Sequence, residues 1–223
     1  MPTWRLVLRS SLVQAAILAL PFLAAGTLRW VRGWYWLGLQ ILTLGTSAVL
    51  THLKNPGLLR ARMEHIKPLE AFDKIFAGYY ALSTATLLIV AGLDARWGWS
   101  QLPWEWLYVG IALQCVGVVP IVAAACINPY LEGMVRIQDD RGHMVITSGV
   151  YSIVRHPMYA GLMLGILSWP LTLGSLWAVI PAVAAALAFS FRAFNEERVL
   201  RDRLPGYPEY MLRTRYRLIP GLW

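Results

Sequence analysis

Residues 146–161, ITSGVYSIVRHPMYAG, bring an arginine, a histidine, a proline and two tyrosines together between long apolar segments. Because a residue that precedes proline avoids the helical region, His156 is expected to be extended, and Pro157 suits the first turn of a following helix. Arg155 and His156 would then lie at a helix N-terminus, where unpaired N–H groups and the helix dipole favour a bound carboxylate or phosphate. In the alternative, both side chains only anchor a membrane helix at the lipid headgroups.

A second group of ionisable residues follows one apolar segment later. Arg192 comes directly after the sequence AFSF, and Glu196 follows four residues later, so the two side chains share one face of a helix. Glu197 is adjacent to Glu196. Alternating charges where a helix leaves the membrane often form only a solvated face, but the depth of Arg192 requires its guanidinium to reach headgroups or a polar cavity. The Arg- and Tyr-rich tail 204–223 would either lie on anionic headgroups or fold over such a site.

Several other kinds of site lack their sequence signals. The chain contains no GxGxxG, GxSxG or HExxH motif, so nothing indicates a nucleotide-binding βαβ unit, a serine hydrolase or a zinc peptidase. Cys115 and Cys126 share one apolar segment without a CxxC motif, which predicts packing residues and no metal site. The apolar segments carry almost no acidic residues, which argues against a proton-coupled transporter.

The composition predicts an integral membrane protein. Of the 223 residues, 57% are hydrophobic and only 14% are charged, whereas soluble domains carry about 25% charged residues. Several apolar segments approach the ~20 residues that cross a bilayer, and many of the eleven tryptophans lie at their ends, as in interfacial aromatic belts. The net charge of +8 is therefore expected to reflect membrane topology, with membrane lipids and not nucleic acid as partners.

The apolar segments predict an all-α protein with four transmembrane helices followed by a C-terminal helical hairpin. The four helices are expected at about 12–28, 34–53, 75–93 and 106–127. Small residues at the end of the first segment would also suit a cleaved signal peptide, although the short link to the second segment favours a pair of helices. The polar segment 54–74 is expected to contain an interfacial helix whose apolar face carries Leu58, Leu59, Met63 and Ile66.

The apolar segment 159–191 is too long for one ordinary helix and contains Pro170, Gly174 and Ser175 near its middle. It predicts two helices, 157–169 and 175–204, folded back on each other; a single kinked helix is the alternative. The hairpin is preferred because it places seventeen of the twenty Lys and Arg residues on the side of the N-terminus, as the positive-inside rule requires. Both termini and the polar segments would then face the cytoplasm.

From residue 128 onward the chain resembles the isoprenylcysteine carboxyl methyltransferase family, within the wider group of membrane methyltransferases that includes the phospholipid methyltransferases. The resemblance rests on GHMVITSGVYSIVRHPMYAG, on RAFNEERVL about forty residues downstream, and on GYPEY. The 54–74 segment, with NPGLLRARM and FDK, resembles the bacterial branch, which would place the protein in a bacterial inner membrane. RHPxY alone is less specific, because membrane sterol reductases share it.

The resemblance implies that the protein binds S-adenosyl-L-methionine in a pocket on the cytosolic side of the helices, without a Rossmann domain. Residues 1–127 would supply N-terminal transmembrane helices, and residues 128–223 the cofactor-binding connector, the hairpin and the tail of one domain. The residues that would contact the cofactor by motif position are Gln138, His143, Met144, Val145, Ile146, Tyr151, His156, Pro157, Met158, Tyr159 and Glu197.

The methyl group of S-adenosylmethionine is already activated, so catalysis would consist mainly of positioning and exclusion of water. Arg192, which matches the family's substrate-side arginine, would hold a carboxylate acceptor, whereas an amine acceptor would need a base such as Glu196. Glu197 would suit the cofactor's ribose or ammonium group, and Arg155 its carboxylate. The acceptor would be a lipophilic small molecule that enters sideways from the bilayer.

The preferred reaction is carboxyl O-methylation of the isoprenylcysteine type. N-methylation of a phospholipid or amine is the alternative within this class. Outside it, the alternatives are a membrane NADPH-dependent reductase of the sterol type and a membrane protein without enzymatic activity. The sequence does not predict the oligomeric state, because no small-xxx-small face stands out from the general Ala, Gly and Leu background.

Overall fold

The computed structural model describes residues 3–64, 71–133 and 136–223, and within that part of the chain it contains helices and no strand. The predicted all-α fold is thereby confirmed. The elements are α1 (Thr3–Ala25), α2 (Val31–Lys54), α3 (Pro56–Glu64), α4 (Ala71–Trp97), α5 (Glu105–Ile127), the 3-10 turns η1 (Asp139–Arg141) and η2 (Gly149–Ser152), α6 (Pro157–Leu173), α7 (Val179–Arg203) and α8 (Tyr207–Arg213).

Among the described residues, four helices are long and apolar enough to cross a membrane: α2, α4, α5 and α7. The part of α1 from Ser11 and the 17-residue α6 are apolar but shorter. At 1.5 Å per residue α6 is about 26 Å long, slightly less than the ~30 Å hydrocarbon core. Because it packs along both α5 and α7, α6 completes the predicted bundle of membrane helices.

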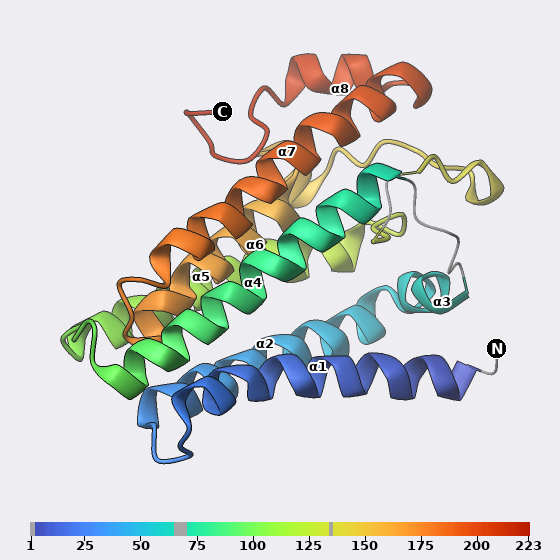
Figure 1. Ribbon diagram of the computed structural model, residues 1–223. Coiled ribbons are helices and arrows are strands. Elements are labelled where there is room, and N and C mark those ends of the chain that lie inside the picture. Colours follow the sequence, from blue (N-terminus) through green and yellow to red (C-terminus); the bar gives the residue numbers. More distant parts are fainter. Residues whose placement is uncertain (1–2, 65–70, 134–135) are drawn as a thin grey trace.

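The long helices run side by side, and their links alternate between the two ends of the bundle (Figure 1). The α1–α2, α4–α5 and α6–α7 links lie at one end. The N-terminus, α3, the connector between α5 and α6, and α8 lie at the other end (Figure 1). The hairpin predicted for the last two membrane helices is therefore confirmed, and the single kinked helix is wrong.

The hairpin turns later than the sequence indicates. α6 was expected to end at Trp169, before Pro170, but it continues to Leu173 and stops at Gly174, which has a left-handed φ of +82°. The N–H groups of Gly174 and Ser175 both donate to the carbonyl of Pro170, at 2.8 and 2.9 Å. Pro170 thus serves as the acceptor of the C-terminal cap, a role that needs no N–H group.

Glycine allows α5 and α6 to approach each other at backbone distance. A Cβ atom on Gly161 of α6 would lie 2.4 Å from the carbonyl oxygen of Gly117 on α5, and one on Gly117 would lie 2.8 Å from the carbonyl of Gly161. Gly165, one turn after Gly161, completes a GxxxG pattern, and its N–H group would be 3.2 Å from the same Cβ of Gly117. Since membrane helices associate largely through such close packing, this contact is a main determinant of the bundle.

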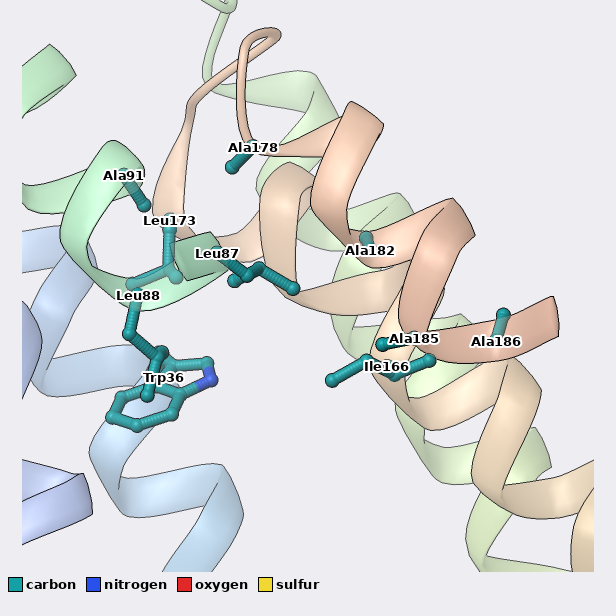
Figure 2. Packing of buried hydrophobic residues seen from close by; sticks show 10 residues of the cluster. All are labelled: Trp36, Leu87, Leu88, Ala91, Ile166, Leu173, Ala178, Ala182, Ala185 and Ala186. Atoms are coloured by element: carbon teal, nitrogen blue, oxygen red, sulfur yellow. The ribbon is translucent and has the colours of Figure 1, made fainter. Parts of the chain in front are cut away.

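A second tight contact surrounds Trp36 on α2, which is completely buried (Figure 2). Leu87 and Leu88 of α4 and Ile166 of α6 lie in the same cluster. From α7 the cluster receives only alanines, whose small side chains let that helix approach its neighbours. These are Ala182, Ala185 and Ala186, with Ala178 just before the helix (Figure 2).

Two buried charged groups hold the links at the end of the bundle opposite α8. The Arg32 guanidinium donates to the carbonyls of Leu102, Pro103 and Leu171 at 2.7–3.2 Å. The Asp94 carboxylate accepts hydrogen bonds from the N–H and hydroxyl groups of Ser100 and from the hydroxyl of Ser175. Their polar partners account for both groups, so neither indicates a catalytic site at this end.

The predicted interfacial helix corresponds to α3, but the structure places it against the bundle. Leu58 is completely buried, and the Asn55 side chain before the helix donates to the carbonyls of Ala125 and Asn128 at the end of α5. The Met63 side chain and Ile66, also expected on the apolar face, lie outside what the structure describes. α3 therefore closes one side of the connector, next to the polar segments discussed below.

Candidate active site

A pocket opens at the end of the bundle where the connector, the start of α6, the end of α7 and α8 meet. Most of the side chains singled out from the sequence line this one pocket. They are His143, Met144, Val145, Ile146, Tyr151, Arg155, His156, Pro157, Met158, Tyr159 and Glu196. Gln138, Arg192 and Glu197 do not line it, although each lies buried close behind a residue that does.

The backbone of the C-terminal tail is hydrogen-bonded to the backbone of the Arg-His-Pro segment. His156 lies outside the helical region, as expected before a proline, but with φ −123° and ψ +63° it is not extended as predicted; Pro157 is the first residue of α6. The N–H groups of Arg155 and His156 donate to the carbonyls of Tyr216 and Arg217, each at 2.9 Å. Of the two possibilities for the tail, the structure therefore shows the one in which it folds back over the polar site.

The carboxylate of Glu197 joins this tail to the two helices. It is only 3% exposed; it accepts hydrogen bonds from Arg155 at 2.5 Å and from Arg217 at 2.6 Å, and Nε2 of His156 lies 3.3 Å away without hydrogen-bond geometry. The Arg155 guanidinium also donates to the carbonyls of Thr214 and Arg215. In this structure Glu197 and Arg155 therefore clamp the tail, and their predicted contacts with a cofactor remain predictions.

Behind the pocket wall, Arg192 is 5% exposed and all its nitrogens are engaged. Its Nε donates to the Tyr159 hydroxyl at 3.0 Å, Nη2 donates to the Gly133 carbonyl at 2.6 Å, and Nη1 lies 3.0 Å from the Asp73 carboxylate of α4. The guanidinium also lies over the Phe76 ring, 4.4 Å from its centre. Asp73 is a partner that the sequence did not suggest, and it balances the charge of Arg192.

Tyr159 connects Arg192 to the pocket. Its hydroxyl accepts from Arg192 and donates to the Glu196 carboxylate at 2.6 Å, and its ring is stacked on that of His156 at 5.5 Å. Glu196 is partly exposed and lines the pocket. The arginine therefore communicates with the pocket through a phenol and a carboxylate, and does not face the pocket directly.

The connector is organised around the almost buried carboxylate of Glu132, whose side chain is 3% exposed. Arg136 donates to both its oxygens at 3.0 and 3.2 Å, and Arg141 donates to one at 3.3 Å. Gln138 supports the same loop: its amide donates to the Tyr130 carbonyl at 2.8 Å and accepts from Arg141 at 2.6 Å. The hydrogen bonds of the Gln138 side chain therefore stay within the connector, which indicates a structural role for this residue.

Tyrosines form much of the opposite wall. The Tyr151 hydroxyl accepts from Asn128 at 2.9 Å, and the Tyr151 carbonyl accepts from the Tyr210 hydroxyl at 2.7 Å. The rings of Tyr207 and Tyr210 are edge to face, 5.6 Å apart. The Tyr207 hydroxyl is buried and has no hydrogen-bond partner among the described residues, which leaves one polar atom for a ligand to satisfy.

Burial determines the protonation of these groups. It raises the pKa of Tyr151 and of Tyr207, and it raises the pKa of Tyr210 to about 12. Burial also lowers the pKa of His143, although the nearby carboxylate of Glu196 opposes the shift. The phenols therefore stay protonated and His143 stays uncharged at neutral pH, so the wall offers neutral rings and hydroxyl groups.

Several lining residues were not among the candidates from the sequence. Tyr207 and Tyr210 belong to the GYPEY motif, and Glu132 and Arg136 belong to the polar connector. No spacing rule connects these residues to residues 155–159. The apolar contributions carry no chemical signal at all. The full set of additional lining residues is Asn128, Tyr130, Leu131, Glu132, Arg136, Leu200, Leu204, Tyr207 and Tyr210.

Comparisons with known proteins identify relatives of this part of the chain. Residues 106–204, which include most of the pocket, match the family model described as phospholipid methyltransferase. The cobalt-zinc-cadmium resistance protein CzcN of Cupriavidus metallidurans is 31% identical over 113 residues, 50% of this chain and 51% of that protein. A probable protein-S-isoprenylcysteine O-methyltransferase of Oryza sativa subsp. indica is 30% identical over 113 residues, 49% of this chain and 52% of that protein.

A Delta(14)-sterol reductase of Mus musculus is 31% identical over 100 residues, but these make up only 24% of the reductase. The chain spans about half the length of the other curated relatives above. The resemblance to the membrane methyltransferases is thereby confirmed. Within the described part of the chain, no three His, Cys, Asp or Glu side chains converge as metal ligands would.

Proposed function

Since the pocket lies in a segment with the sequence pattern of the phospholipid methyltransferases, we propose that this protein is an integral membrane methyltransferase that uses S-adenosyl-L-methionine to methylate a lipophilic small molecule. One observation carries the proposal. The RHPxY sequence and the EExxL sequence, about forty residues apart in the chain, meet at a single pocket: Tyr159 of the first donates a hydrogen bond to Glu196 of the second.

The pocket offers groups for each part of S-adenosylmethionine. The tyrosine rings suit the adenine ring and the sulfonium, and Glu132 and Arg136, which pair with each other in the structure, carry the charges that complement its ammonium and carboxylate groups. The Tyr207 hydroxyl and Nε2 of His156, which lies 3.3 Å from the Glu197 carboxylate, are buried polar atoms without a hydrogen bond among the described residues. The donor and acceptor set therefore fits this cofactor.

When bound, S-adenosylmethionine supplies a methyl group on a positively charged sulfur, ready for attack by a nucleophile. The protein residues would contribute geometry. The Glu197 carboxylate fixes Arg155 and the tail, and α8, through Tyr207 and Tyr210, covers the pocket and excludes water. Arg192 fixes the Tyr159 hydroxyl, which in turn fixes the Glu196 carboxylate at the pocket wall.

The lipophilic nature of the acceptor is supported by a groove between α4 and α7. Its wall is almost entirely apolar and includes Phe76, Leu187 and Phe191, and its volume is about 390 Å³. Phe191 is 73% exposed, as expected for a side chain in contact with lipid. Because the Arg192 guanidinium lies over the Phe76 ring, an acceptor in this groove would have its polar end beside the Arg192–Tyr159–Glu196 chain.

Within this class we propose a carboxylate acceptor. Arg192 can hold a carboxylate, as its contact with Asp73 demonstrates, so an acceptor carboxylate would replace Asp73 on the same guanidinium. An amine acceptor is the second candidate, because Glu196 reaches the pocket and could take up the proton that an ammonium group must lose. A cytoplasmic location of this end is supported by the distribution of Lys and Arg, and a bacterial inner membrane by the resemblance of the 54–74 segment to the bacterial branch.

Glu196→Gln is expected to separate the two acceptors. Since a carboxylate nucleophile carries no proton, methylation of a lipophilic acid should fall less than about tenfold, whereas methylation of a lipophilic amine should fall by about 10² or more without its base. The measurement is incorporation of radiolabelled methyl groups into a long-chain acid and a long-chain amine in parallel. Glu209→Gln, a change at an exposed carboxylate of α8, should leave both unchanged; equal losses on both acceptors would contradict the assignment.

Tyr207→Phe is expected to leave the unfolding free energy within about 1 kcal/mol or to raise it, because the hydroxyl that it removes has no partner. The same change should weaken binding of S-adenosylhomocysteine about tenfold if this hydroxyl contacts the cofactor. Tyr210→Phe is the matched control, since it deletes a hydrogen bond to the Tyr151 carbonyl and should lower stability by about 1 kcal/mol. Thermal unfolding and calorimetric titration provide the two readouts; unchanged cofactor affinity in Tyr207→Phe would contradict the contact.

The decisive test of the proposed function is calorimetric titration of the purified protein with S-adenosylhomocysteine, with NADPH as the parallel ligand. Saturable binding of S-adenosylhomocysteine alone is expected. Binding of NADPH alone would replace the proposal with a reductase of the sterol type. A folded protein that binds neither would favour a membrane protein without enzymatic activity.

A further inference from the structure

A second cavity lies inside the bundle, where α1, α2, α4, α5 and α6 meet, and it shares no lining residue with the pocket described above. Its volume is about 240 Å³, which corresponds to about eight water molecules at ~30 Å³ each. Most of its wall is apolar, with Leu18, Leu44, Ile121 and Ile166 among the lining side chains, and none of the described side chains that line it is charged. It is therefore a site for a neutral molecule.

Two polar side chains of α2 line this cavity and have no hydrogen-bond acceptor among the described residues. The indole Nε1 of Trp36, which is completely buried, and the amide Nε2 of Gln40, which is 7% exposed, both lack an acceptor. Figure 2 shows the indole nitrogen on the side of the ring that faces Ile166, another residue of the cavity wall. Because the two residues are four apart on one helix, both donors lie on the same face of α2.

A third polar side chain of the cavity wall, in contrast, has hydrogen-bond partners. Gln114 on α5 also lines the cavity, but its amide donates to Thr43 at 3.3 Å and accepts from Ser168 at 2.7 Å. A buried donor left without an acceptor costs about 1–3 kcal/mol, and two of them on one wall double that cost. A bound acceptor would remove it.

We propose that this cavity binds a neutral lipophilic molecule that carries a carbonyl oxygen, with Trp36 and Gln40 as its hydrogen-bond donors. A carbonyl oxygen has two lone pairs and can accept from both side chains. The apolar wall binds the hydrocarbon part, and the absence of a charged lining residue excludes carboxylates, phosphates and amines as the group bound here. The site is independent of the proposed methyl transfer.

Infrared spectroscopy of a long-chain ketone labelled with carbon-13 at the carbonyl tests this site directly. The ketone is added to purified protein in detergent, and the spectrum recorded with the unlabelled ketone is subtracted, so that the protein's amide band cancels. A hydrogen-bonded carbonyl absorbs at lower frequency than one dissolved in the micelle. The wild type is expected to show a shifted band that saturates at one ketone per protein. The alkane of the same length should not displace it.

The variants Gln40→Met and Trp36→Phe should each weaken binding of the ketone about tenfold, since each removes one of its two hydrogen-bond donors. Gln101→Met and Trp177→Phe, the same changes at exposed side chains, are the matched controls and should keep the shifted band. Thermal unfolding verifies that every variant is folded. A wild-type spectrum without a shifted band, as a cavity filled only by water would give, overturns the proposal, and so does a band that persists in both cavity variants.

Discussion

Replacing Glu197 by alanine is expected to lower the free energy of unfolding by roughly 3–5 kcal/mol and to abolish methyl transfer. The carboxylate is 3% exposed and faces the guanidinium groups of Arg155 and Arg217. Without it, Arg155 becomes an uncompensated charge that is only 6% exposed, and the tail loses its ionic contact with α7. Since the tail covers the Arg-His-Pro segment, the pocket should open to water.

The tail provides a readout that separates this mechanism from a simple loss of catalysis. Limited proteolysis of Glu197→Ala should cut the chain between α8 and the C-terminus much faster than in the wild type, before the bundle unfolds. Glu209→Ala, which removes an exposed carboxylate from α8, should have no effect on stability or on cleavage. Wild-type stability and activity in Glu197→Ala would show that neither the clamp nor the predicted cofactor contact matters.

Substituting valine for Gly161 is expected to cost more than about 3 kcal/mol, above the usual range for an overpacked core. A Cβ atom there would lie 2.4 Å from the carbonyl oxygen of Gly117, and a backbone atom in a helix cannot move aside as a flexible side chain can. α5 and α6 would have to separate along their length, which would also displace Pro157 and Tyr159 at the start of α6.

The matched control for Gly161→Val is Gly45→Val on α2, where a Cβ atom would meet nothing within 4 Å. Both changes place valine in the middle of an apolar helix, so their helix propensities cancel. Thermal unfolding in detergent measures the difference; equal melting temperatures for the two variants would contradict the role of this contact.

The sequence predicts the helices of this protein well because hydropathy dominates their formation. The expected segment 106–127 coincides with α5 to within one residue at its start, and α6 begins at Pro157, directly after the non-helical His156. The end of α6 was missed because Pro170 was treated as a helix breaker. In the cap, the N–H groups of Gly174 and Ser175 donate to the carbonyl of Pro170. A sequence pattern does not show which carbonyl groups become such acceptors.

The site was only partly predictable for a related reason. Residues 143–146 and 155–159 were found through local motifs, and they do line one pocket. Asp73 was not found, because it lies 119 positions before Arg192 in the chain. Their contact depends on how α4 and α7 pack against each other. The sequence placed Glu197 and Arg155 in separate roles toward a cofactor, whereas the fold joins them to each other.

The glycine contact between α5 and α6 also determines which parts of the bundle can move. Two helices joined backbone to backbone behave as one rigid body, whereas α4 and α7 meet near the groove through aromatic side chains such as Phe76 and Phe189, whose rings are 5.5 Å apart. Side chains can change rotamer far faster than packed backbones can separate. We therefore expect motions that open the bundle to be concentrated at the contact between α4 and α7. The fluidity of the surrounding lipid should affect this contact first.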